Sequence, residues 1–283
     1  MKLLADVTPA AAARVFAVSN VAFLGVDIAL AHMANAFAHP GEWAPIVFSA
    51  LATLLLVPGA LGQRGRLPAS LDLVAGWGAV VVGVVGMVFH LESGFFTAQT
   101  LHNLVYSAPF VAPLSYVGLG LLILLLRSEE ADKPALGPWL LLLSLGGFVG
   151  NYGLSVLDHA QNGFFQATEW IPVASAALAI GILAVTLATR DARVRLACLA
   201  IMGGQVVVGV AGFVLHVTAD LNRPAASALD RFVFGAPAFA PLLFADLAAL
   251  AAIGIWALRG TTERAPAPRS GPSGAVPAPT ATD

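Results

Sequence analysis

Eight long stretches of this chain consist almost entirely of apolar residues. They lie near 14–32, 43–61, 71–90, 103–126, 138–158, 170–189, 195–216 and 232–258. A helix needs roughly 20 apolar residues to cross the hydrocarbon core of a bilayer. Only 11% of the residues are charged, whereas soluble domains carry about 25%. The sequence therefore predicts an all-α integral membrane protein with eight transmembrane helices, surrounded by the lipid bilayer.

The basic residues predict the orientation of the chain in the membrane. Of the 14 lysines and arginines, Arg223 and Arg231 fall on one side of the predicted helices and the other twelve on the opposite side. Because Lys and Arg accumulate in cytoplasmic loops, we expect a multi-pass protein of the cell inner membrane with both termini in the cytoplasm. The loops expected outside are 32–43, 90–103, 159–169 and 216–232. The net charge of −2 indicates no nucleic-acid partner.

Three motifs occur once in each half of the chain, 126 to 128 residues apart. They are H-x-x-N-x-F-x-x-x-x-E-W-x-P at 32–45 and 159–172, G-V-x-G-x-V-x-H at 83–90 and 209–216, and A-P-x-x-A-P-L at 108–114 and 236–242. Three matches at nearly one offset indicate the tandem duplication of a four-helix unit.

The duplication divides the chain into four regions. We expect a first four-helix membrane half at 1–127, a charged cytoplasmic linker at 128–137, a second four-helix half at 138–259, and a disordered tail rich in Pro, Ala, Ser and Thr at 260–283. Each half has an even number of spans, so both halves run in the same direction. A pseudo-two-fold axis along the membrane normal should relate them.

Four of the six histidines end the odd-numbered spans at equivalent repeat positions: His32, His90, His159 and His216. All four should lie at the outer end of the membrane, at equal depth. The first and third helices of a four-helix bundle face each other diagonally across its core. Two histidines at one height would then bind one iron from both sides of a haem. The sequence therefore predicts one haem b per half, between His32 and His90 and between His159 and His216.

Glycines precede two of these histidines by four and seven residues, which places them on the histidine face of each helix. Gly86 and Gly83 hold these positions before His90, and the equivalent pair before His216 is Gly212 and Gly209. A wall without side chains suits a flat macrocycle. The same spacing also lets membrane helices pack closely without any cofactor. Both interpretations stay open at this stage.

Five further polar residues are candidates for orienting a histidine or carrying a proton: Glu42, Glu169, Asp27, Asp246 and Gln205. The two glutamates open spans 2 and 6, where a carboxylate also stabilises a helix N-terminus. We favour that structural explanation over a role as metal ligands, and a contact to a histidine N–H is the functional alternative. The two aspartates lie within spans, where acids are costly and indicate function. Gln205 shares a helix face with His216.

Three functions are compatible with these residues. The first is a redox membrane protein with haem b near the outer face, passing electrons between a membrane quinol and an outer-face redox protein. The second is a metal-handling or transport protein, in which the four histidines, with His39, His102 and both glutamates, converge on the central axis to bind copper or zinc. The third is a cofactor-free accessory subunit of a membrane complex. No nucleotide-binding, c-type haem or zinc-protease motif is present, and no catalytic residue can be nominated.

The plan of two four-helix halves with paired histidines toward the outer face is similar to that of haem A synthases. In the present sequence the histidines end the odd spans, whereas in that family they open the even spans, and no sequence motif is shared. The resemblance implies haem binding and assigns no reaction.

Overall fold

The structure is a computed structural model that describes residues 7–63, 65–127 and 135–262. The described residues form helices and no strand, as the sequence predicts. Most of the expected linker 128–137 lies outside the described residues. The expected tail 260–283 lies outside them from residue 263 onward.

The helices are given in chain order. Those of the first half are α1 (Pro9–Met33), α2 (Trp43–Ala60), α3 (Arg66–Glu92), α4 (Leu101–Tyr106) and α5 (Leu114–Arg127), with the 3₁₀ turn η2 (Pro40–Glu42) before α2. Those of the second half are α6 (Leu136–Gln161), α7 (Trp170–Ala188), α8 (Ala192–Asn222), α9 (Ala228–Val233) and α10 (Leu242–Thr262), with the 3₁₀ turn η4 (Ala167–Glu169) before α7.

Seven of the described helices are long and apolar enough to cross a membrane. They are α1, α2, α3, α6, α7, α8 and α10, where α2 and α7 are counted with their preceding 3₁₀ turns. Large apolar side chains such as Leu54, Val81, Leu196 and Val207 point outward and are more than half exposed. Water would not tolerate so much exposed apolar surface, whereas lipid does. The protein is therefore built for a membrane environment.

The predictions of single continuous helices at 103–126 and 232–258 are wrong. An irregular segment at 107–113 separates α4 from α5, and another at 234–241 separates α9 from α10. The repeated motif A-P-x-x-A-P-L lies within these breaks. Each proline lacks the N–H that a helix needs and disfavours helical backbone in the residue before it. As a result α5 has only 14 residues and is about 21 Å long, short of the roughly 30 Å of a bilayer core.

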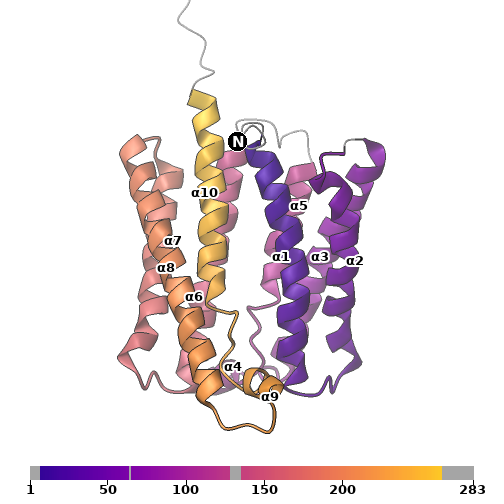
Figure 1. The fold of residues 1–283 in the computed structure, drawn as a ribbon, viewed down its shortest axis with the longest axis vertical. Helices are drawn as coiled ribbons and strands as arrows, with labels where there is room; N and C mark the ends of the chain where they lie inside the picture. Colours follow the sequence, from indigo (N-terminus) through magenta and orange to yellow (C-terminus); the bar gives the residue numbers. More distant parts are fainter. Residues whose placement is uncertain (1–6, 64, 128–134, 263–283) are drawn as a thin grey trace, which may run out of the picture.

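The helices gather into two groups that meet along the middle of the molecule (Figure 1). In the first group α1 packs on α2, α2 on α3, and α3 on α5; in the second α6 packs on α7, α7 on α8, and α10 on both α6 and α8. The groups touch through α1 with α10 and through α5 with α6. These two contacts are equivalent under the sequence repeat. The pseudo-two-fold rotation of the whole halves stays a prediction.

Both ends of the described chain lie at one end of the bundle, opposite the short helices α4 and α9 (Figure 1). Near that end a buried ion pair joins α1 to α3, because Arg14 Nη1 donates to Asp72 Oδ2 over 2.8 Å. The same guanidinium also donates to the carbonyl of Leu126 in α5. One arginine therefore ties three helices of the first half together.

Candidate functional site

The four span-ending histidines lie at the end of the bundle opposite the chain termini. His32, His90 and His159 are in the last turn of α1, α3 and α6, and His216 lies in α8, which continues to Asn222. All four are partly buried. The antiparallel packing of consecutive long helices brings the ends of α1, α3, α6 and α8 to the same side.

The structure brings the histidines together as two pairs. The rings of His32 and His90 have centres 6.3 Å apart and planes at 83°. His159 and His216 lie within electrostatic range of each other. Among the described residues, no group of three or more His, Cys, Asp or Glu side chains has a geometry that could hold a metal ion. The four histidines thus do not form the single convergent site that the transport hypothesis requires.

One histidine of each pair is held by a backbone carbonyl of a broken helix. His90 Nδ1 lies 3.0 Å from the carbonyl oxygen of Pro109, and His216 Nδ1 lies 2.9 Å from that of Pro237. A carbonyl only accepts, so Nδ1 must carry the proton in both rings. A neutral imidazole then keeps its lone pair on Nε2, the atom available to bind a metal. Sequence reasoning missed these carbonyls, which also accept the turn hydrogen bonds of the Ala112 and Ala240 N–H groups. The signal was the second proline of each motif, which lies four residues on and has no N–H to offer as the helical partner.

The other histidine of each pair faces a glutamate. His159 Nδ1 lies 3.7 Å from Glu169 Oε2, and that carboxylate oxygen is buried without a hydrogen-bond partner. In the first half, His32 Nδ1 and Glu42 Oε2 are both buried and unpaired, and the two side chains interact electrostatically. A small movement would pair each histidine with its glutamate. Such a pairing again leaves Nε2 free, as in carboxylate–histidine–metal arrangements.

The repeated loop motif builds the same local structure twice. Phe37 and Phe164 adopt a positive φ of 52°, which is uncommon for an aromatic residue. Each ring stacks on the tryptophan that opens the next helix, Trp43 or Trp170, at a centre-to-centre distance of 4.2 Å. The Phe backbone N–H also donates to the carbonyl of the preceding histidine. The loop therefore fixes the position of the glutamate relative to the histidine.

The two loop histidines outside the repeat do not join the pairs. His39 Nδ1 accepts from the backbone N–H of Gly41 and so caps η2. His102 is exposed in α4, where its ring packs on that of Tyr106. Their geometry gives them structural roles and does not supply further ligands.

The four candidate glycines contact the broken helices. A Cβ added at Gly83 would lie 2.8 Å from the carbonyl oxygen of Pro113, and one at Gly209 would lie 2.9 Å from that of Pro241. At Gly86 and Gly212 it would meet the rings of the same two prolines. The glycines face the interior of their own half, where the close approach of α5 and α10 fills the space beside them. They serve helix packing, and Gly83 and Gly209 do not form an open wall.

Of the remaining polar candidates, two form hydrogen bonds between helices and one faces a cavity without such a bond. Gln205 Oε1 accepts from Ser175 over 2.8 Å and links α8 to α7. Asp246 Oδ1 accepts from Asn20 Nδ2 over 2.9 Å, which joins α10 to α1 across the two halves. Asp27 has no such partner among the described residues and faces a cavity.

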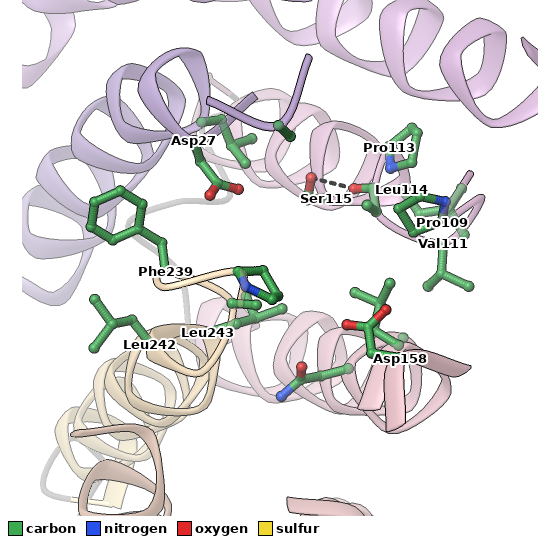
Figure 2. Close-up of a pocket in the computed structure, with 18 of the residues that line it drawn as sticks. Asp27, Pro109, Val111, Pro113, Leu114, Ser115, Asp158, Phe239, Leu242 and Leu243 are labelled. Atoms are coloured by element: carbon green, nitrogen blue, oxygen red, sulfur yellow. Dashed lines mark hydrogen bonds between the residues drawn. The ribbon is translucent and has the colours of Figure 1, made fainter. Parts of the chain in front are cut away.

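A cavity of about 3430 Å³ lies between the two halves. All four span-ending histidines line it, together with Asp27, Asp246, Gly86 and Gly212. Figure 2 shows its apolar wall, with the prolines of one broken helix on one side and Phe239, Leu242 and Leu243 on the other.

Asp158, which the sequence analysis did not single out, also reaches this space (Figure 2). The sequence signal that could have identified Asp158 is its position directly before His159. No lysine or arginine is among the described residues that line the cavity.

No protein family, no curated protein and no protein of known structure matches this chain.

Proposed function

We propose that this protein is a membrane redox protein that holds one haem b between His32 and His90 and a second between His159 and His216. The observation that carries the proposal is the pairing of the histidines within each half, with one Nδ1 of each pair anchored on a proline carbonyl. The haems would pass electrons between a membrane quinol and a redox partner at the outer face.

The spacing of the first pair suits two ligands on opposite sides of one iron. A metal–nitrogen bond is about 2 Å long, and the centre of an imidazole ring lies about 1 Å beyond the nitrogen. Two opposed imidazoles therefore have centres about 6 Å apart, and those of His32 and His90 are 6.3 Å apart. The free Nε2 lone pairs supply the donor chemistry that haem iron accepts.

The number of ligands favours haem over a bare ion. A structural zinc site needs four protein ligands and a catalytic one needs three. Each half offers two histidines, and the described residues contain no group of three suitable ligands. Haem supplies four equatorial nitrogens itself, so two axial histidines complete the coordination. The cavity beside both pairs offers room for the macrocycle, whereas the faces of Gly83 and Gly209 do not.

A second candidate function rests on the buried, unpaired carboxylate oxygens of Glu42 and Glu169. With a small shift, each would join its histidine pair as a third ligand. The protein would then bind copper or zinc in each half and handle or transport that metal.

An absorbance spectrum of the protein purified from haem-replete cells tests the first proposal. We expect a Soret band that sharpens and shifts on reduction, and its loss in His90→Ala/His216→Ala. The matched control is His39→Ala/His102→Ala, which should keep the spectrum because neither residue joins a pair. A colourless protein with stoichiometric copper or zinc would support the second candidate. A colourless, metal-free protein would leave the accessory-subunit hypothesis.

A further inference from the structure

Two partly buried carboxylates that line the central cavity have no hydrogen-bond partner among the described residues. Asp27 from α1 and Asp158 from α6 enter it from opposite sides, and both side chains point into the space (Figure 2). No hydrogen bond or ion pair joins either carboxylate to another described residue. An acid at this depth is costly unless a partner or a proton satisfies it. These two groups are not used by the histidine pairs.

A buried amide in the same cavity also lacks a partner. Asn151 lies seven residues before Asp158, on the same face of α6, and is only 4% exposed. It lines the cavity, and its Nδ2 has no hydrogen-bond acceptor. Leaving a buried hydrogen-bond donor unpaired is energetically costly. This amide therefore indicates an acceptor atom that a bound molecule would supply.

The three groups together define the ligand. No lysine or arginine lines the cavity to compensate the carboxylates, so the ligand must offer them a cation or an O–H donor. The unpaired N–H of Asn151 requires an acceptor oxygen, which an alkylammonium or phosphonium ion lacks. The rest of the wall is mostly apolar and includes Phe23 and Phe239. An apolar ring with oxygens that both donate and accept meets all of these requirements.

We infer that the cavity binds the head group of a membrane quinol, with Asp27, Asp158 and Asn151 as its polar contacts. The inference rests on the proposed function and deepens it by assigning the site of the electron donor. Asp158 directly precedes His159, and Asp27 lies five residues before His32, about 7.5 Å along the helix. The head group would therefore lie next to both histidine pairs.

The carboxylates have a chemical role in this site. Oxidation of a quinol to a quinone breaks two O–H bonds and releases two protons and two electrons. Asp27 and Asp158 would each accept one proton. The two electrons would go to the two haems that the histidine pairs of the proposed function would hold, one electron to each.

Binding of decylubiquinol to the full chain, purified in detergent and kept reduced with excess dithionite under nitrogen, tests the inference without any turnover. Quinol retained by the protein after size-exclusion chromatography is extracted and quantified over a range of concentrations. We expect saturable binding that weakens roughly tenfold or more in Asp27→Asn and in Asp158→Asn, because each loses a charged hydrogen-bond acceptor. Asn151→Leu should weaken binding while the protein still folds, since it removes an unpaired buried group. The matched control is Asp230→Asn in α9, outside the cavity, with unchanged binding.

Three outcomes would overturn the inference: no saturable binding of decylubiquinol or menadiol, binding unaffected by all three cavity variants, or saturable binding of tetraphenylphosphonium that excludes the quinol. The last result would identify a site for lipophilic cations. A protein with a Soret band but no quinol binding keeps the proposed function and loses this inference. A colourless protein whose quinol binding depends on Asp27 and Asp158 supports the cavity site and overturns the haem proposal.

Discussion

The Nδ1 atom of His216 lies 2.9 Å from the carbonyl oxygen of Pro237. This carbonyl belongs to the break between α9 and α10, where it also accepts the turn hydrogen bond of the Ala240 N–H. Its helical partner four residues on would be Pro241, which has no N–H. The break therefore turns a backbone group into an anchor for a histidine. The same relationship recurs between His90 and Pro109 in the first half.

Removing the two prolines of one break should dismantle one site. In Pro237→Ala/Pro241→Ala residue 241 gains an N–H and the helix can extend. The carbonyl of residue 237 should then exchange its turn bond with Ala240 for a helical bond to residue 241 and release His216. Haem content per chain should then fall by about half, because only the second half loses its oriented ligand. The pyridine haemochrome assay measures this content. Pro58→Ala, in α2 near the opposite end of the bundle, is the control, and equal haem content in all three proteins would contradict the anchoring role.

The glutamates should act through the histidines. Glu169→Gln keeps the size of the side chain but removes the charge that faces His159 Nδ1 at 3.7 Å. Loss of such a partner weakens metal binding by roughly 10- to 100-fold, so haem should transfer faster to an apoprotein acceptor. Glu92→Gln, at the exposed end of α3, should transfer haem at the original rate. If Glu169→Gln instead abolished stoichiometric copper or zinc, the glutamate would be a direct ligand.

The membrane character and the histidine pairs were predictable because both follow from spacing. Apolar length gives the spans, and the 127-residue repeat places His32 with His159 and His90 with His216. The diagonal arrangement of the first and third helices then predicts which histidines meet. The observed ring distance between His32 and His90 agrees with that prediction.

The broken helices were not predictable from the same signal. The mean hydropathy of a stretch does not reflect the missing N–H groups of Pro109 and Pro113. Residues 103–126 therefore look like one continuous apolar helix. The carbonyl partners of the histidines depend on where the irregular backbone turns, which no spacing rule supplies. The glycines were ambiguous for a related reason: their role depends on the helix opposite, and α5 approaches Gly83 only because it begins at Leu114.

The ion pair near the chain termini predicts a large effect on stability. Arg14 and Asp72 are both mostly buried, so removing either leaves an unpaired buried charge. Arg14→Met or Asp72→Leu should each lower the free energy of unfolding by about 3–5 kcal/mol, measured by denaturant titration in detergent micelles. The double variant Arg14→Met/Asp72→Leu should lower the free energy of unfolding by much less than the sum of the two single effects. Arg66→Met, in the first turn of α3, should change stability by less than about 0.5 kcal/mol; equal effects in all single variants would contradict the buried pair.

Alanine variants of two glycines in α8 test whether a glycine is needed for helix packing. A Cβ at Gly209 would lie 2.9 Å from the carbonyl oxygen of Pro241 and 3.1 Å from the amide nitrogen of Ala245, whereas a Cβ at Gly203 would meet nothing within 4 Å. Gly209→Ala should therefore push α10 away and destabilise the protein by about 1–3 kcal/mol. Gly203→Ala should stabilise it by roughly 0.5–1 kcal/mol, since alanine favours the helix.

The same pair of variants distinguishes why Gly209 is a glycine. If it serves helix packing, Gly209→Ala lowers the thermal unfolding temperature equally in haem-loaded and haem-free protein, because the contact with Pro241 exists in both. If it instead made room for a macrocycle, the haem-free protein would tolerate the alanine and only haem binding would suffer. The close approach of the Pro241 carbonyl leads us to expect equal losses in both forms. Thermal scans of the two preparations, with Gly203→Ala beside each, measure the difference.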